Sequence, residues 1–163
     1  VLQSRGLGDV YKRQGLDLID FKENSSSIHI ADIFNKLHKP KLVLLEGDVH
    51  AGGVLIVACA NYVISKKDVK LSLPEVKRGL FPLQVMDSLF RSMPKKSVID
   101  WCINGKEMTA EQCKKLNLID EVCDNNLMDL CQNWIDQTLS MSPNAIRTGL
   151  RVYDELYLSL IHI

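Results

Sequence analysis

A glycine-rich segment between two apolar stretches, residues 47–53, has the composition of a place where a ligand meets the backbone. Its sequence is Gly-Asp-Val-His-Ala-Gly-Gly, and glycines let another group approach the main chain closely. A helix starting at Gly52 would leave its first N–H groups without partners inside the helix, so they could donate to an anionic oxygen. An ordinary tight turn between a strand and a helix fits the same pattern, and the segment alone leaves both interpretations open.

Glu75 is the second candidate, because it directly follows an apolar stretch and a proline in Leu-Ser-Leu-Pro-Glu, residues 71–75. Such a carboxylate is poorly placed for solvent. Burial beside a substrate pocket would raise its pKa and suit it to proton transfer. An isolated glutamate at a helix start is more often a surface residue, so that alternative also stays open. His50 could bond a polar substrate group, but a partly buried histidine bonded to the backbone is the commoner case.

The elements that must position these residues alternate between strands and helices. Residues 41–46 predict a strand buried on both faces, and residues 54–59 predict a buried helix opened by Gly52 and Gly53. Thr109 and Gln112 have the spacing of a capping box at the start of a short helix. Further strands are expected at 62–65, 69–73 and 119–122, and further helices at 30–37, 83–90, 95–103, 109–116, 127–135 and from Pro143 onward. This alternation predicts an α/β fold.

Composition narrows the classes of function. The 163 residues suffice for one domain, and 20 basic residues balance 20 acidic ones, so the net charge gives the chain no electrostatic attraction to nucleic acid or to an anionic membrane. No apolar run approaches the roughly 20 residues of a membrane span. The five cysteines are odd in number and none are two residues apart, which argues against a disulfide framework and a zinc site. We expect buried thiols in a reducing compartment, the cytoplasm.

The two ends of the chain differ from its middle. Residues 1–14 show no helical or strand period and, like residues 158–163, look like translated sequencing adaptor. We expect both ends to be artefactual or disordered, and we expect residues 15–157 to form part of one domain.

Several motifs, in order, carry a family resemblance. Gly-Leu-Asp-Leu (15–18) resembles the tail of the Ala-Gly-Ala-Asp-Ile segment of the crotonase superfamily, the enoyl-CoA hydratases and isomerases. Val-His-Ala-Gly-Gly (49–53) resembles its glycine-rich turn, after a strand headed by Lys39-Pro40. Leu-Pro-Glu-Val-Lys-Arg-Gly-Leu-Phe-Pro (73–82) resembles its catalytic-glutamate segment. Ile-Asn-Gly-Lys (103–106), the helix at Thr109 and Leu-Ile-Asp-Glu-Val (118–122) are similar to its downstream stretch.

The resemblance implies a partial crotonase-like spiral of strand–strand–helix units, followed by C-terminal helices and packed as trimers or hexamers when complete. It implies an acyl-CoA thioester substrate, with coenzyme A part of that substrate and with no separate cofactor and no metal. The backbone N–H groups of Leu16 and Gly52 would form an oxyanion hole for the enolate, and Glu75 would be the catalytic acid/base. The implied substrate-binding residues are Leu16, Asp17, Leu18, Ile19, Ala51, Gly52 and Gly53.

One departure from the family pattern affects the expected reaction. Hydratases of the family use two glutamates, and the position of the first falls on Leu55, which cannot exchange a proton. A single carboxylate can still move a proton between two carbons, so isomerisation fits best, while hydration remains the family's commonest activity. Two alternatives stay open: a polyketide-type dehydratase or decarboxylase acting on acyl-carrier-protein thioesters, and a catalytically inactive binding module.

Overall fold

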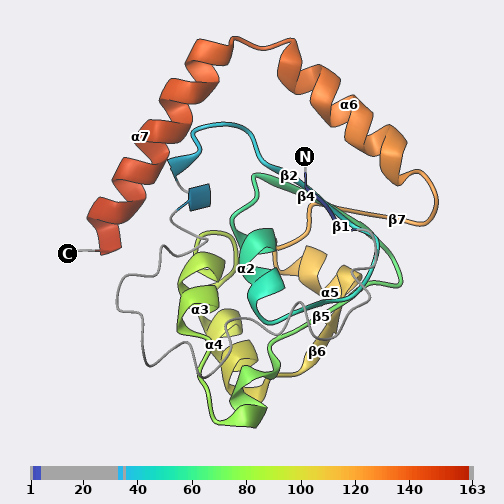
Figure 1. Cartoon of the computed structure of the whole chain (residues 1–163), viewed down its shortest axis with the longest axis vertical. Helices are drawn as coiled ribbons and strands as arrows, with labels where there is room; N and C mark the ends of the chain where they lie inside the picture. Colours follow the sequence, from blue (N-terminus) through green and yellow to red (C-terminus); the bar gives the residue numbers. More distant parts are fainter. Residues whose placement is uncertain (1, 5–32, 35, 162–163) are drawn as a thin grey trace.

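The computed structural model describes residues 2–4, 33–34 and 36–161, and its elements alternate as expected for an α/β fold (Figure 1). The strands are β1 (Leu2–Ser4), β2 (Leu42–Leu45), β3 (Val49–His50), β4 (Tyr62–Lys66), β5 (Lys70–Ser72), β6 (Glu107–Thr109) and β7 (Glu121–Cys123). The helices are α2 (Gly52–Ala58), the 3₁₀ helix η2 (Pro74–Arg78), α3 (Leu83–Leu89), α4 (Lys95–Asn104), α5 (Ala110–Lys115), α6 (Leu127–Leu139) and α7 (Pro143–Ile161).

The strands form two sheets. The larger has the order β1-β2-β4-β7, and all of its pairs are parallel. The smaller has the order β3-β5-β6, in which β3 and β5 are parallel and β6 is antiparallel to β5. The consecutive strands β4 and β5 therefore do not pair with each other, because the turn between them carries the chain from the larger sheet to the smaller one.

Strand β2 is buried on both faces, as its apolar run predicted. Val43 and Leu45 belong to a large core shared with α2, α3, α4 and α5, whereas Leu42 and Leu44 belong to a second core beneath α6. Successive side chains of a strand point to opposite faces, so this four-residue segment supplies both cores. Such double burial is typical of a parallel sheet that carries helices on both faces.

Two helices confirm predictions from local sequence pattern. Helix α4 agrees with the predicted range 95–103 to within one residue, and its residues Val98, Trp101 and Cys102 are fully buried. At the start of α5 the Thr109 side chain accepts from the Gln112 N–H (3.3 Å), and the Gln112 side chain accepts from the Thr109 N–H (2.9 Å). This is the predicted capping box.

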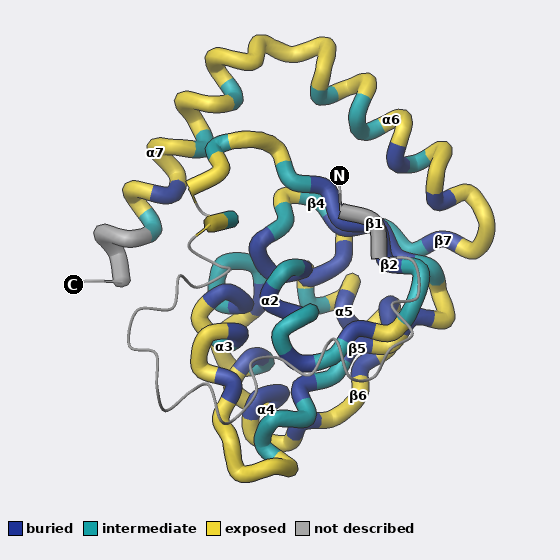
Figure 2. Tube along the Cα trace, viewed as in Figure 1, coloured by how far each residue is buried: buried dark blue, intermediate teal, exposed yellow. Residues whose placement is uncertain are grey.

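Helices α6 and α7 form an arch over the rest of the molecule, and much of their surface is exposed (Figures 1 and 2). Helix α6 covers the larger sheet, where Leu127 and Cys131 are buried and Trp134 stacks on Tyr62 with ring centroids 5.6 Å apart. Helix α7 contacts the body through Asp154, which pairs with Arg91 at 3.0 Å. Within the described part of the chain, no helix combines the length and apolar character needed to cross a membrane.

The ends of the chain differ in part from expectation. Leu2–Ser4 form strand β1 on the edge of β2, although the sequence of residues 1–14 shows no strand period. A strand pairs through its backbone, so a sheet edge accepts a partner with little regard to side-chain pattern. Helix α7 continues to Ile161, beyond the expected end of the domain at residue 157. The segment 15–19, with its predicted site residues, lies outside the described residues.

Candidate active site

Two neighbouring parallel strands, β3 and β5, lead into the two segments that contain the candidate site residues Gly52 and Glu75. Val49 pairs with Leu71, and His50 pairs with Ser72. Gly52 follows the end of β3 by two residues, and Glu75 follows the end of β5 by three. Because the carboxyl ends of parallel strands meet at the same edge of a sheet, both segments start from one edge, where α/β proteins commonly bind ligands.

The turn at Ala51 gives the glycine segment its shape. Ala51 has φ 51° and ψ −125°, a left-handed conformation that costs a non-glycine residue about 1–3 kcal/mol. Two hydrogen bonds hold it, because its N–H donates to the Ser72 carbonyl (3.0 Å) and its own carbonyl accepts from the Val54 N–H (2.9 Å). Ala51 is also buried, so packing as well as hydrogen bonds holds this turn in its strained conformation.

Gly52 and Gly53 are the first residues of α2. A Cβ at Gly53 would lie only 2.9 Å from Cγ1 of Val49, so the close packing of α2 on β3 requires glycine there. The Gly52 N–H has no hydrogen-bond acceptor among the described residues, as expected at the first position of a helix. Within the described part of the chain, no other group uses this N–H as a donor.

Glu75 is half-buried in η2, and its Oε2 atom is buried without a hydrogen-bond partner in the described part of the chain. Burial raises the pKa of this carboxyl, while a backbone hydrogen bond and the nearby Arg78 guanidinium oppose the rise. A raised pKa is the direction that proton exchange near neutral pH requires. Burial, together with the charge of Glu75, raises the pKa of the Cys102 thiol to about 11, so this neighbour stays neutral.

The side chains of His50 and Asp48 both bond to residues of β5. The Nδ1 atom of His50 lies 2.8 Å from the Ser72 hydroxyl oxygen, so its partner is a side chain and not the expected backbone group. Asp48 accepts a hydrogen bond from the Lys70 N–H at 2.9 Å. No sequence signal marks these cross-strand partners, because each lies 22 residues away along the chain.

Leu55, which the resemblance aligns with the family's first glutamate, is buried in α2 and belongs to the large core. The cysteines Cys59, Cys102, Cys113, Cys123 and Cys131 are all buried and free, as predicted. No cluster of three or more histidine, cysteine, aspartate or glutamate side chains suited to a metal ion occurs among the described residues.

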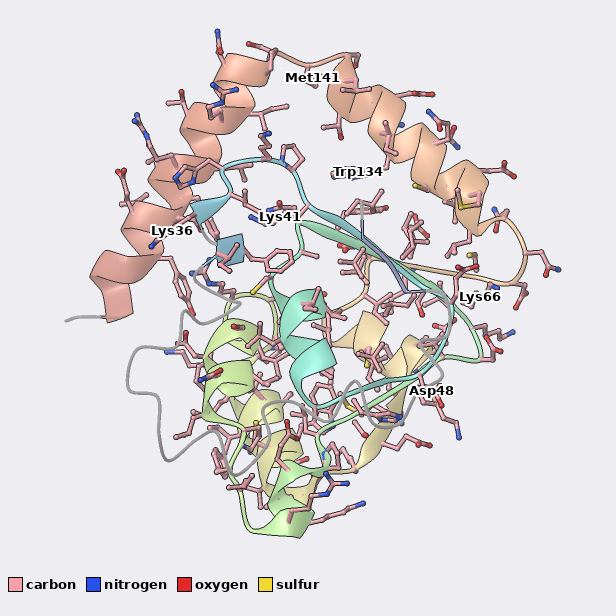
Figure 3. All side chains as sticks on the ribbon, viewed as in Figure 1. Lys36, Lys41, Asp48, Lys66, Trp134 and Met141 are labelled. Atoms are coloured by element: carbon pink, nitrogen blue, oxygen red, sulfur yellow. The ribbon has the colours of Figure 1, made fainter. Side chains whose placement is uncertain are left out.

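A cavity of about 240 Å³ lies at the opposite end of α2 from Gly52, next to α3 and α7. Charged groups in its wall already have partners, since the Lys41 ammonium donates to two backbone carbonyls, of Phe34 (3.2 Å) and Leu37 (3.3 Å), and Arg91 pairs with Asp154. Figure 3 labels Lys41 close to the chain that leads into β2. We therefore place the candidate active site at the ends of β3 and β5.

Comparison with known proteins identifies the family of the chain. The family model described as enoyl-CoA hydratase/isomerase matches residues 15–155. The fatty acid oxidation complex subunit alpha of Pseudomonas syringae pv. syringae (strain B728a) is 31% identical over 100 residues, which are 61% of this chain and 14% of that protein. Its counterpart in Pseudomonas putida (strain GB-1) is 30% identical over the same shares of the two chains.

Solved structures share the fold at lower identity. An enoyl-CoA hydratase from Shewanella pealeana aligns with TM-score 0.74 and 22% identity over 79% of this chain and 48% of that one. The human enoyl coenzyme A hydratase domain-containing protein 3 aligns with TM-score 0.71 and 18% identity over 77% and 50%. The chain thus spans about half of these structures and a much smaller share of the Pseudomonas proteins. By its family match, its motifs and its crotonase fold, the chain belongs to the enoyl-CoA hydratase/isomerase family.

Proposed function

We propose that the protein containing this chain acts on an acyl-CoA thioester through an enolate held in a backbone oxyanion hole. The observation that carries the proposal is the pairing of β3 with β5, which starts the Gly52 turn and the half-buried Glu75 from one sheet edge. The names of the relatives, fatty acid oxidation subunits and enoyl-CoA hydratases, support a CoA thioester as substrate.

In the proposed reaction the Glu75 carboxylate takes a proton from the carbon next to the thioester carbonyl. The electron pair of the broken C–H bond moves into the carbonyl, and the negative charge collects on its oxygen. The Gly52 N–H binds that oxygen, and the resemblance assigns the second donor to the N–H of Leu16, which lies outside the described residues. Each such donor contributes about 2.7–4 kcal/mol to lowering the barrier in enzymes of this type.

Protonated Glu75 then returns the proton to a different carbon of the same acyl chain. When the enolate is conjugated with a carbon–carbon double bond, this step moves the double bond and completes an isomerisation. The single carboxylate favours isomerisation over hydration, because Leu55 is an apolar core residue where a hydratase would need its first glutamate. No other molecule is consumed, so one acid/base residue suffices.

The test is Glu75→Gln in the full-length protein, with CoA-ester binding and double-bond isomerisation measured separately. We expect turnover to fall at least about a hundredfold, the usual minimum contribution of a positioned acid/base, while binding of the ester persists. Glu111→Gln, at an exposed glutamate of α5, is the matched control and should retain turnover. Unchanged turnover in Glu75→Gln would overturn the assignment.

A non-catalytic binding module is the second candidate, and Leu55 is the observation that favours it, because loss of the first glutamate is what such a module would show. It predicts that the unaltered full-length protein binds a CoA ester without converting it. Assays with both CoA-bound and carrier-protein-bound thioesters also separate the proposed substrate from the acyl-carrier alternative.

A further inference from the structure

The C-terminal end of α4 packs directly on the backbone that flanks Glu75. Gly105 caps α4 with φ +58°, and its N–H donates to the Trp101 carbonyl at 2.9 Å. A Cβ built on Gly105 would lie 2.8 Å from the carbonyl oxygen of Leu73 and 2.9 Å from Cγ1 of Val76. Contacts this short do not persist in a folded protein, so any side chain at this position must displace one of the two segments.

The α4 side of this contact is firmly held. Trp101 is fully buried in the large core, and its indole N–H donates to the Lys106 carbonyl at 2.8 Å, which fixes the chain just after Gly105. Cys102, one residue further along α4, is also fully buried. On the other side of the contact, Leu73 is also fully buried, whereas η2, which follows it, has no fully buried residue. A collision at Gly105 would therefore be relieved mainly in η2, the segment that carries Glu75.

We propose that Gly105 is a positioning residue for Glu75. Because Gly105 has no side chain, α4 packs closely on the turn 73–76, and this packing sets where the carboxyl group lies. This inference rests on the proposed function for its catalytic consequence. Its structural content, that Gly105 controls the surroundings of the Glu75 carboxyl, is independent of any particular reaction.

Displacement of the turn has a measurable electrostatic consequence. Burial is the main cause of the raised pKa of Glu75, and Arg78 on its own turn is the charged group that acts on it. From α4, the titratable group coupled to Glu75 is the Cys102 thiol, which is neutral near pH 7. A turn pushed away from α4 exposes the carboxyl to water, so the pKa of Glu75 should fall toward its ordinary value.

The experiment compares Gly105→Ala with Gly79→Ala in the full-length protein. Gly79 also has a left-handed backbone, with φ +78°, but a Cβ there would meet nothing within 4 Å. Both variants therefore introduce similar backbone strain, and only Gly105→Ala adds the collision. The Glu75 carboxyl is titrated by NMR after carboxyl-¹³C labelling of glutamate, with its signal assigned by its loss in Glu75→Gln, and kcat and KM are measured in parallel.

We expect Gly105→Ala to lower the pKa of Glu75 and to reduce kcat about tenfold or more with little change in KM, as misplaced catalytic groups do. Gly79→Ala, which strains the cap of η2 without a collision, should lower the pKa of Glu75 less than Gly105→Ala does. If Gly105→Ala does not fold, Gly105→Asn is used in its place, because asparagine carries the same Cβ and tolerates a left-handed backbone.

Equal Glu75 titrations in Gly105→Ala and Gly79→Ala would overturn the inference. Failure of the proposed function gives a different pattern, in which the unaltered protein converts no thioester or Glu75→Gln keeps full turnover. The titration still decides whether Gly105 positions Glu75 in that case, because it requires no catalysis.

Discussion

The Ser72 hydroxyl oxygen lies 2.8 Å from Nδ1 of His50 and joins the two strands that lead to Glu75 and Gly52. The same serine accepts the Ala51 N–H on its backbone carbonyl at 3.0 Å. Ser72 thus holds the Gly52 turn through both its backbone and its side chain, while its own strand continues toward Glu75. The side-chain bond is the part of this connection that a substitution can remove.

Ser72→Ala should reduce kcat about tenfold, because the two halves of the site lose a fixed relation to each other. The free energy of unfolding should fall by only about 1 kcal/mol, the usual net contribution of one hydrogen bond. Steady-state kinetics and urea unfolding measure the two effects. Ser72→Thr, which keeps the hydroxyl group, is the control and should recover most of kcat; equal losses in both variants would contradict the prediction.

Glu75 should make the folded state less stable as the pH rises. Its pKa is raised in the folded protein, so the folded state holds the proton more tightly than the unfolded chain does. The free energy of unfolding therefore falls as the pH increases from the unfolded pKa through the folded pKa, and this loss persists above that range. Glu75→Gln removes the ionisation, so we expect the variant to be the more stable protein at pH 7–8 despite its lost turnover.

Urea unfolding of both proteins between pH 4 and pH 8 measures this effect. The stability advantage of Glu75→Gln should shrink toward the acid end, where the unaltered carboxyl becomes increasingly protonated in both states. A constant difference across the whole range, or a less stable Glu75→Gln at pH 8, would show that the carboxyl is not held in a desolvated place.

Local features of the fold were predictable from the sequence because they depend on near neighbours. The apolar run of β2 predicted its double burial, and the Thr109 capping box depends on residues three positions apart. The predicted helix at 95–103 agrees with α4 to within one residue. Each of these signals is complete within about ten residues of chain.

Long-range features were not predictable in the same way. Strand β3 has only two residues, too few for an alternation pattern, and its partner β5 lies beyond α2 and β4. The contact of Gly105 with the turn 73–76 likewise joins segments some thirty residues apart. Local sequence pattern and a family resemblance both pointed to Gly52 and Glu75, whereas the contacts that hold them required the structure.

Leu55→Glu should not convert the site into a two-glutamate site without a large loss of stability. Leu55 is 5% exposed and packs in the large core. A carboxyl group there would lose its hydration and gain no hydrogen-bond partner in exchange. We expect the free energy of unfolding to fall by about 3 kcal/mol or more. Leu55→Met, of similar volume, should cost less than about 1.5 kcal/mol. A stable Leu55→Glu protein that gains hydratase activity would contradict this view of the core.

Helix α7 should depend on one ion pair for its place on the body. Arg91 and Asp154 lie 3.0 Å apart with side chains 11% and 12% exposed, and His38 is 3.5 Å from the same carboxylate. The Arg91 guanidinium also lies 4.2 Å from the ring centroid of Tyr157. Removing one partner of such a pair leaves the other charge poorly solvated, which costs about 3–5 kcal/mol in buried pairs.

Asp154→Ala should therefore speed amide hydrogen exchange throughout α7 and leave exchange in the buried part of α4 unchanged, because α4 does not depend on this pair. Glu155→Ala, at the next residue, is the matched control, since its ion pair with Arg151 is long (3.9 Å) and exposed. Pairs of that kind contribute at most about 1 kcal/mol. Equal acceleration in the two variants would mean that the helix itself, and not its contact with Arg91, limits exchange. Faster exchange confined to Asp154→Ala would identify this ion pair as the contact that fixes α7.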